Sequence, residues 1–134
     1  MAFEWEDYLI LAEDLSNDEN DEAALRCAVS RAYYAAFHIA KNFLNGIDDP
    51  ALKVSENKPS IHHEVWNAFL GRGRHWQAMF NTGNRLKKRR TNADYEPGPK
   101  YPDGQSKNWS KEAEQSLREA DSVLQWVRDN AGKK

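Results

Sequence analysis

The chain has 134 residues, of which 40% are hydrophobic and 30% are charged, and its formal net charge is −2. These values favour one soluble domain, residues 1–134, that is long enough to bury a sizeable core. Cys27 is the only cysteine, which excludes an internal disulfide and a cysteine-based zinc site. No apolar run approaches the length of a membrane span, and the acidic start is unlike a signal peptide. We therefore expect a cytoplasmic protein without membrane contact.

Charge is unevenly distributed along the sequence. Residues 1–24 are rich in Asp and Glu, whereas residues 71–90 are rich in Arg and Lys. This asymmetry allows a local anion site on a mildly acidic protein.

The first half of the chain predicts two helices. The first spans residues 3–15 and has an apolar face. The residues of this face are Trp5, Tyr8, Leu9, Ala12 and Leu15. A polar turn follows, and a long second helix runs from Asp21 to the Asn45–Gly46 pair, which is typical of a helix end.

The second half predicts three more helices, separated by loops at 47–59 and 96–108. Ser60 is the expected N-cap of a short third helix that ends at Gly71 and Gly73. The fourth helix spans residues 75–95, and the last begins at Ser110. No alternating pattern demands a strand. The sequence therefore predicts an all-α fold, an antiparallel bundle of four main helices plus one short helix.

The second predicted helix carries two stripes. Small and apolar residues form the first, which is typical of a tightly packed core helix, and Cys27 is expected to be a small core residue there. Its members are Leu25, Ala28, Ala32, Ala36, Ile39 and Phe43. Arg31, Tyr34 and His38 form the second stripe. This stripe is a wet groove, a His and Tyr hydrogen-bonded inside the bundle, or one wall of an anion pocket that faces Arg90.

Arg90 marks a second candidate functional site. It follows Met79, Gly83 and Leu86 at helical spacing, so it points along the seam that this helix buries. A buried Arg needs partners, and Asp94 lies four residues on. Arg90 either forms an internal ion pair with Asp94 or is held there for a phosphate, and both can be true.

The segment RAYYAAFH in the second helix, a His at the start of the next helix and an Arg-rich segment ending in RTNADY together resemble a HEPN domain. HEPN domains are small helical bundles, and many are metal-independent RNases that act as dimers. The resemblance covers residues 5–127. It implies a HEPN-like bundle, a homodimer, and a nucleotidyltransferase as a possible protein partner.

The sequence departs from the nuclease motif of that family. Arg90 matches the motif Arg, but Tyr95 stands where a nuclease carries His, and no His follows it. A tyrosine titrates near pH 10 and is a poor general base at neutral pH. An RNase would therefore need His38 or His62 as a substitute.

Three functions follow as hypotheses. The first is a non-catalytic or degenerate module that binds RNA or a nucleotide through Arg90. The second is a metal-independent, toxin-like RNase with Arg90 and His38 as catalytic residues. The third is a protein-interaction module. The expected binding residues are Arg31, Tyr34, Lys87, Arg89, Asn92, Asp94 and Tyr95. The four histidines show no metal-ligand spacing, so no metal and no cofactor are expected.

Overall fold

The computed structural model describes residues 2–47, 49–54, 60–95 and 108–131. These residues form five α-helices and one 3-10 helix, and they include no strand. The elements are α1 (Glu6–Leu15), α2 (Glu22–Gly46), η1 (Pro50–Leu52), α3 (Ile61–Asn67), α4 (Arg74–Tyr95) and α5 (Trp109–Asn130). The prediction of an all-α bundle with four main helices and one short helix is confirmed.

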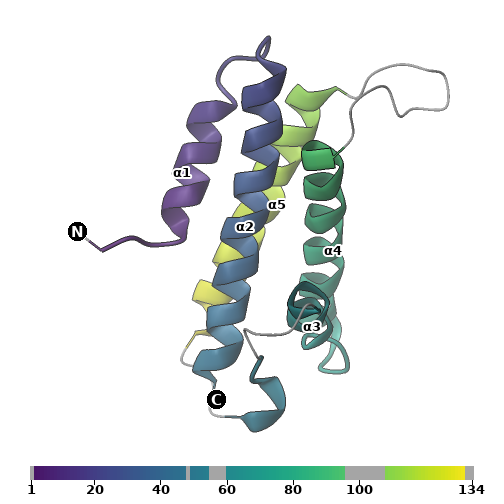
Figure 1. The fold of residues 1–134 in the computed structure, drawn as a ribbon. Coiled ribbons are helices and arrows are strands. Elements are labelled where there is room, and N and C mark those ends of the chain that lie inside the picture. The colour runs from purple at the N-terminus through teal and green to yellow at the C-terminus, as the bar shows by residue number, and fades with distance from the viewer. Residues whose placement is uncertain (1, 48, 55–59, 96–107, 132–134) are drawn as a thin grey trace, which may run out of the picture.

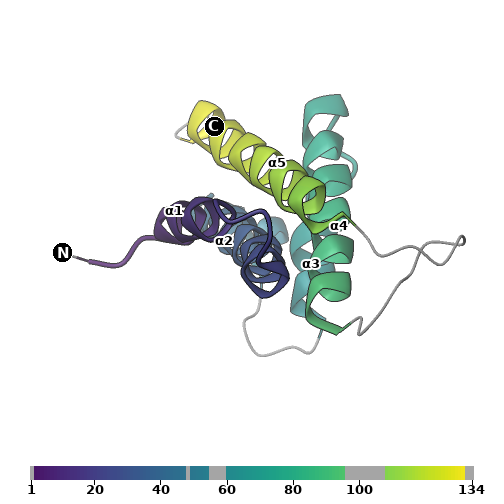
Figure 2. The same cartoon turned by 90° about the horizontal axis from the view of Figure 1, so that it is seen from above.

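Helix α2 is the centre of the bundle and contacts every other α-helix. Successive long helices alternate in direction, so that α1 and α4 run one way and α2 and α5 the other (Figure 1). Seen from above, α1 and α4 lie on opposite sides of α2, and α5 packs behind it (Figure 2). The face of α2 opposite α5 is therefore left as a strip between α1 and α4.

The alanines of α2 explain how it can have so many neighbours. Side chains that end at Cβ let a neighbouring backbone approach closely, and Ala28, Ala32 and Ala36 are completely buried. The predicted small-residue stripe is thus confirmed as core. The prediction that Cys27 is a small core residue is wrong, because Cys27 is exposed. It lies on the strip between α1 and α4, where α2 has no covering helix.

One close approach fixes how α3 sits against α4. A Cβ atom added to Gly83 of α4 would lie 2.1 Å from the ring of Trp66 on α3. Only glycine leaves room for this indole, which is completely buried. Trp66 in turn reaches the site described below.

Side chains cap the first turns of α2 and α5, whereas Ser60 occupies the predicted N-cap position of α3 without a side-chain cap hydrogen bond. Asp21 caps α2 by accepting from the backbone N–H of Ala24, as its type predicts. The cap of α5 is Asn108 rather than Ser110, because its side chain accepts from the N–H of Lys111. Gly71 and Gly73 have φ of 80° and 103°, a conformation that favours glycine and separates α3 from α4.

Two predicted loops are only partly described. The short helix η1 lies within the predicted loop 47–59, where Asp49 accepts from the N–H of Ala51 and Pro50 begins the turn. Residues 48, 55–59 and 96–107 lie outside the described part of the chain. Among the helices that are described, none is both long enough and apolar enough to cross a bilayer.

Candidate anion-binding site

The site is built around Arg90, on the last turns of α4. Its guanidinium carbon lies 5.5 Å from the ring centre of Tyr33 and 5.4 Å from that of Tyr34, both on α2. The side chain is only 12% exposed. Tyrosine rings attract cations through their negative faces, so the two rings hold the guanidinium between α2 and α4.

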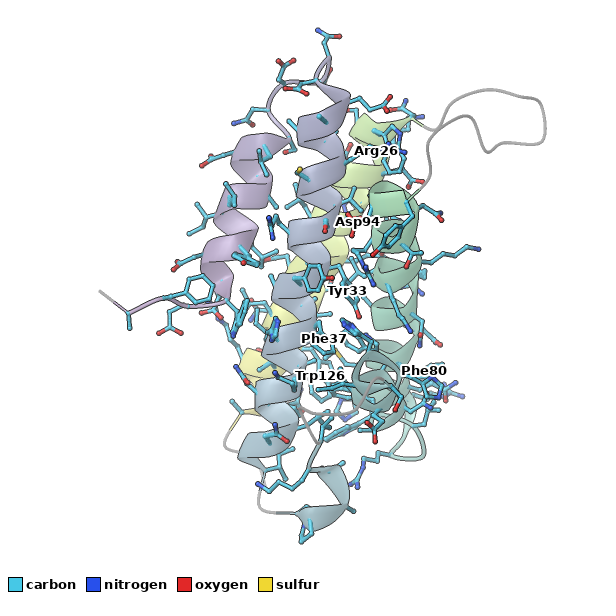
Figure 3. The ribbon with its side chains drawn as sticks, in the orientation of Figure 1. Arg26, Tyr33, Phe37, Phe80, Asp94 and Trp126 are labelled. Carbon is cyan, nitrogen blue, oxygen red and sulfur yellow. The ribbon has the colours of Figure 1, made fainter. Side chains whose placement is uncertain are left out.

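Arg90 has few polar partners. Its Nη1 donates to Asp94 Oδ2 over a long 3.4 Å, and the same oxygen accepts from Ser30 Oγ at 3.4 Å. The Nε of Arg90 is buried and has no hydrogen-bond partner among the described residues. A buried donor without an acceptor costs about 1–3 kcal/mol, and because Nε is covered, an incoming acceptor reaches it only when a neighbouring side chain moves. Figure 3 shows Tyr33 and Asp94 along the interface between α2 and α4.

A hydrogen-bonded chain supports the Tyr33 side of the site. The indole Nε1 of Trp66 donates to the Tyr33 hydroxyl at 3.2 Å, and that oxygen lies 2.7 Å from Nδ1 of His62. An indole N–H can only donate, so the tyrosine oxygen accepts from Trp66. Between Tyr33 and His62 the tyrosine O–H donates when the His62 proton is on Nε2, and His62 Nδ1–H donates in the other tautomer. Helix α3 therefore fixes both Tyr33 and His62.

The two titratable groups of this chain have shifted pKa values. Burial raises the pKa of Tyr33 above its ordinary value of about 10, although Trp66 and Arg90 favour the charged form. Burial also lowers the pKa of His62, and the cations Arg90, Lys87 and Lys41 lower it further. His62 is therefore neutral at pH 7, and it lies within the field of Arg90 and two lysines.

The basic neighbours of Arg90 divide into two groups. Arg89 points toward α5, where it pairs with Glu119 and with Glu112, and Arg85 donates to Glu119 at 2.6 Å. Burial alone would raise the pKa of Glu119, but hydrogen bonds from Arg89 and Arg85 lower it. Arg85 and Arg89 thus hold α4 against α5, whereas Lys87 lowers the pKa of His62.

The predicted stripe of α2 is divided between two neighbours. Tyr34 meets Arg90, but Arg31 lies 5.2 Å from the ring centre of Tyr8 on α1. His38 stacks on Trp5 at 3.6 Å, in the segment just before α1. The structure therefore places Arg31 and His38 on the α1 side of α2, while Tyr34 is on the α4 side.

Two further predicted residues lie near the end of α4. Asn92 is half-buried, and Tyr95 is 73% exposed. The expected site residues that the structure brings together are Arg90, Asp94, Tyr34 and, through its effect on His62, Lys87.

Tyr33 is absent from the predicted site, and His62 enters it only as an alternative to His38 for the base of an RNase. Tyr33 falls among the apolar positions of α2, so its spacing indicates only a core residue. His62 shares a face with Val65, Trp66 and Phe69 and was expected to be a packed histidine. The available signal was the histidine that opens α3, which belongs to the HEPN resemblance.

The described residues form no metal centre, and known proteins give no family for the chain. Within the described residues, no group of three or more His, Cys, Asp or Glu side chains could hold a metal ion. Comparisons of the chain with protein-family models, with curated proteins and with solved structures return no match.

Proposed function

We propose that this chain is a HEPN-like module that binds RNA or a nucleotide through an anion site centred on Arg90. The observation that carries the proposal is the Arg90 guanidinium. It is largely buried over two tyrosine rings, and among the described residues it has one long ion pair and a buried Nε without a hydrogen-bond partner. A phosphate oxygen is the acceptor that a planar guanidinium suits best.

The surroundings of Arg90 support an anionic ligand. The charged groups that lower the pKa of His62 are Arg90, Lys87 and Lys41, all of them cations. With its proton on Nε2, neutral His62 offers a further donor. Tyr33 is completely buried, but the ring of Tyr34 is partly exposed and offers a surface on which a base can stack. A phosphate beside a planar base, as in RNA or a nucleotide, matches these groups.

The test is a binding titration with matched charge variants. A fluorescein-labelled oligoribonucleotide and ADP are titrated at low salt into wild type, Arg90→Gln and Arg118→Gln. Arg118 is the control because it is exposed and pairs with Glu114 one turn away. We expect Arg90→Gln to weaken binding about 10- to 100-fold, as loss of a charged hydrogen bond predicts. Equal losses in both variants, or no binding by wild type, would overturn the proposal.

The second candidate is a metal-independent RNase, and the position of His62 is what favours it. For this step His62 takes the other tautomer, in which Nδ1–H donates to the Tyr33 hydroxyl and the free Nε2 accepts the proton of a ribose 2′-hydroxyl. The ribose oxygen then attacks the adjacent phosphorus and expels the 5′-oxygen of the next nucleotide, which takes up a proton from solvent. Arg90 would stabilise the charge that develops on the phosphoryl oxygens. His38 was the predicted base, but its stack on Trp5 makes His62 the better candidate.

Cleavage of labelled RNA in the presence of EDTA separates the two candidates. If the chain is an RNase, His62→Gln and Arg90→Gln lose activity, while His38→Gln keeps it. If wild type binds RNA without cleaving it, the binding module is supported and the RNase is excluded.

A further inference from the structure

A cavity of about 870 Å³ lies at the end of the bundle where α2 and α5 terminate. It is separate from the anion site, since Trp76 in its wall is about 20 Å along α4 from Arg90. Small-molecule sites have volumes of about 300–1,000 Å³, so this cavity can hold an organic ligand.

The walls of the cavity are largely aromatic and aliphatic. Trp5 comes from the segment before α1, Phe43 from α2 and Trp76 from α4, with Ile39 and Val127 among the aliphatic contributors. The rings of Phe43 and Trp76 lie 5.9 Å apart and are tilted. These surfaces suit the apolar body of a ligand.

The polar groups of the cavity are mainly acidic. The described lining includes the carboxylates of Glu4, Glu6 and Asp49 and a single basic residue, Arg72. The carboxyl ends of α2 and α5 also lie here, and helix ends of this kind carry partial negative charge. The Nζ of Lys53 already donates to the carbonyl of Asn45 near the end of α2, at 2.5 Å. The cavity therefore favours a cation and disfavours an anion.

Arg72 shows where a cation is held. Its guanidinium lies 3.6 Å from Asp49 Oδ2 and 5.6 Å from the ring centre of Trp76. A carboxylate and an indole face on either side of a cation are the two partners that recognise ammonium and guanidinium groups. We propose that this cavity binds an organic cation with an apolar body, and that Arg72 competes with its charged head for Asp49 and Trp76.

The first experiment is a titration with benzyltrimethylammonium, followed by the indole N–H signals in a ¹H–¹⁵N spectrum. The signals are assigned by single Trp→Phe variants. We expect saturable shifts of Trp5 and Trp76, while Trp109 at the far end of α5 stays unchanged. Benzyl alcohol and benzoate serve as the neutral and anionic probes, and both should bind about 5- to 30-fold more weakly, given a cation–aromatic attraction of about 1–2 kcal/mol.

Variants of the charged groups then test the arrangement. Asp49→Asn should weaken binding of benzyltrimethylammonium, and asparagine can still cap η1 by accepting from the N–H of Ala51. Arg72→Gln should strengthen it, because the internal competitor is gone. Glu6→Gln gives a second acidic variant, and Asp121→Asn, which is exposed on α5, is the control.

Two results would overturn the inference. Equal binding of the cationic, neutral and anionic probes would show an apolar pocket without charge preference. Shifts that leave Trp5 and Trp76 unaffected, or that are unchanged in both Asp49→Asn and Arg72→Gln, would place the cation elsewhere.

Discussion

His62 lies between a hydrogen-bond donor and three cations, and this position makes the stability of the fold depend on pH. Folding lowers the pKa of His62 below its ordinary value of about 6.5, first by burial and then through Arg90, Lys87 and Lys41. The unfolded chain therefore takes up a proton at His62 at a higher pH than the folded chain does. The stability that depends on neutral His62 is present above about pH 6.5 and is lost as the pH falls toward the folded pKa.

The free energy of urea unfolding, measured between about pH 5.5 and 7.5, checks this prediction. Wild type should lose stability toward the acidic end of the range, and His62→Gln should lose less. His63→Gln is the control, since His63 is the exposed neighbour of His62 and forms a hydrogen bond with Asn67 on its own helix. The same pH slope in wild type and His62→Gln would show that His62 is not the group responsible.

Arg90 and His62 also show what can be predicted from sequence at the scale of a residue. The spacing of Arg90 from Leu86 and Asp94 indicates both its burial and its ion pair, because all three lie on one helix of known period. The contact between His62 and Tyr33 joins two helices. It depends on the rotation of α3, which no periodicity within α3 specifies.

At the scale of an element, the packing of α3 on α4 depends on Gly83. Replacing it with alanine would put a methyl group within the ring of Trp66, which cannot turn aside without breaking its bond to Tyr33. We expect Gly83→Ala to lower the free energy of unfolding by about 1–3 kcal/mol and to disturb Tyr33 and the site.

Denaturant unfolding of a matched pair of variants tests the Gly83 prediction. Gly46, at the end of α2, has nothing within 4 Å of an added Cβ, so Gly46→Ala should be neutral or slightly stabilising. Similar stabilities for the two variants would mean that the indole can move at little cost.

Helix α5 is held to α4 by a buried carboxylate. The side chain of Glu119 is only 9% exposed and pairs with both Arg85 and Arg89. Glu119→Gln removes the charge and leaves Arg89 dependent on Glu112, so we expect a loss of about 2 kcal/mol in thermal or chemical unfolding. Glu114→Gln breaks an exposed pair with Arg118 and should change stability by less than about 0.5 kcal/mol. Equal effects would show that burial adds nothing to the Glu119 pairs.

At the scale of the whole molecule, the helices and their order could be predicted from the sequence. Which neighbouring helix contacts each side of α2 could not. Arg31, Tyr34 and His38 occupy one arc of α2, as their spacing requires. That arc covers the strip between α1 and α4, so its two edges meet different neighbours. The stripe therefore splits, with Tyr34 joining Arg90 and the other two joining α1. Only the angle at which α1 and α4 pack on α2 decides this.

The last prediction compares Arg89 with Lys87 and rests on the proposed RNA binding. Arg89 is engaged by Glu119 and Glu112, whereas Lys87 acts on the site through His62. Each phosphate contact to single-stranded RNA contributes about 0.7 to the slope of log K against log salt concentration. Lys87→Gln should make that slope less steep by about 0.7. Arg89→Gln should leave the slope unchanged and lower the free energy of unfolding. Anisotropy titrations over a salt series measure both slopes. If the slope became less steep in Arg89→Gln and stayed the same in Lys87→Gln, RNA would lie on the α5 side of α4 and away from Arg90.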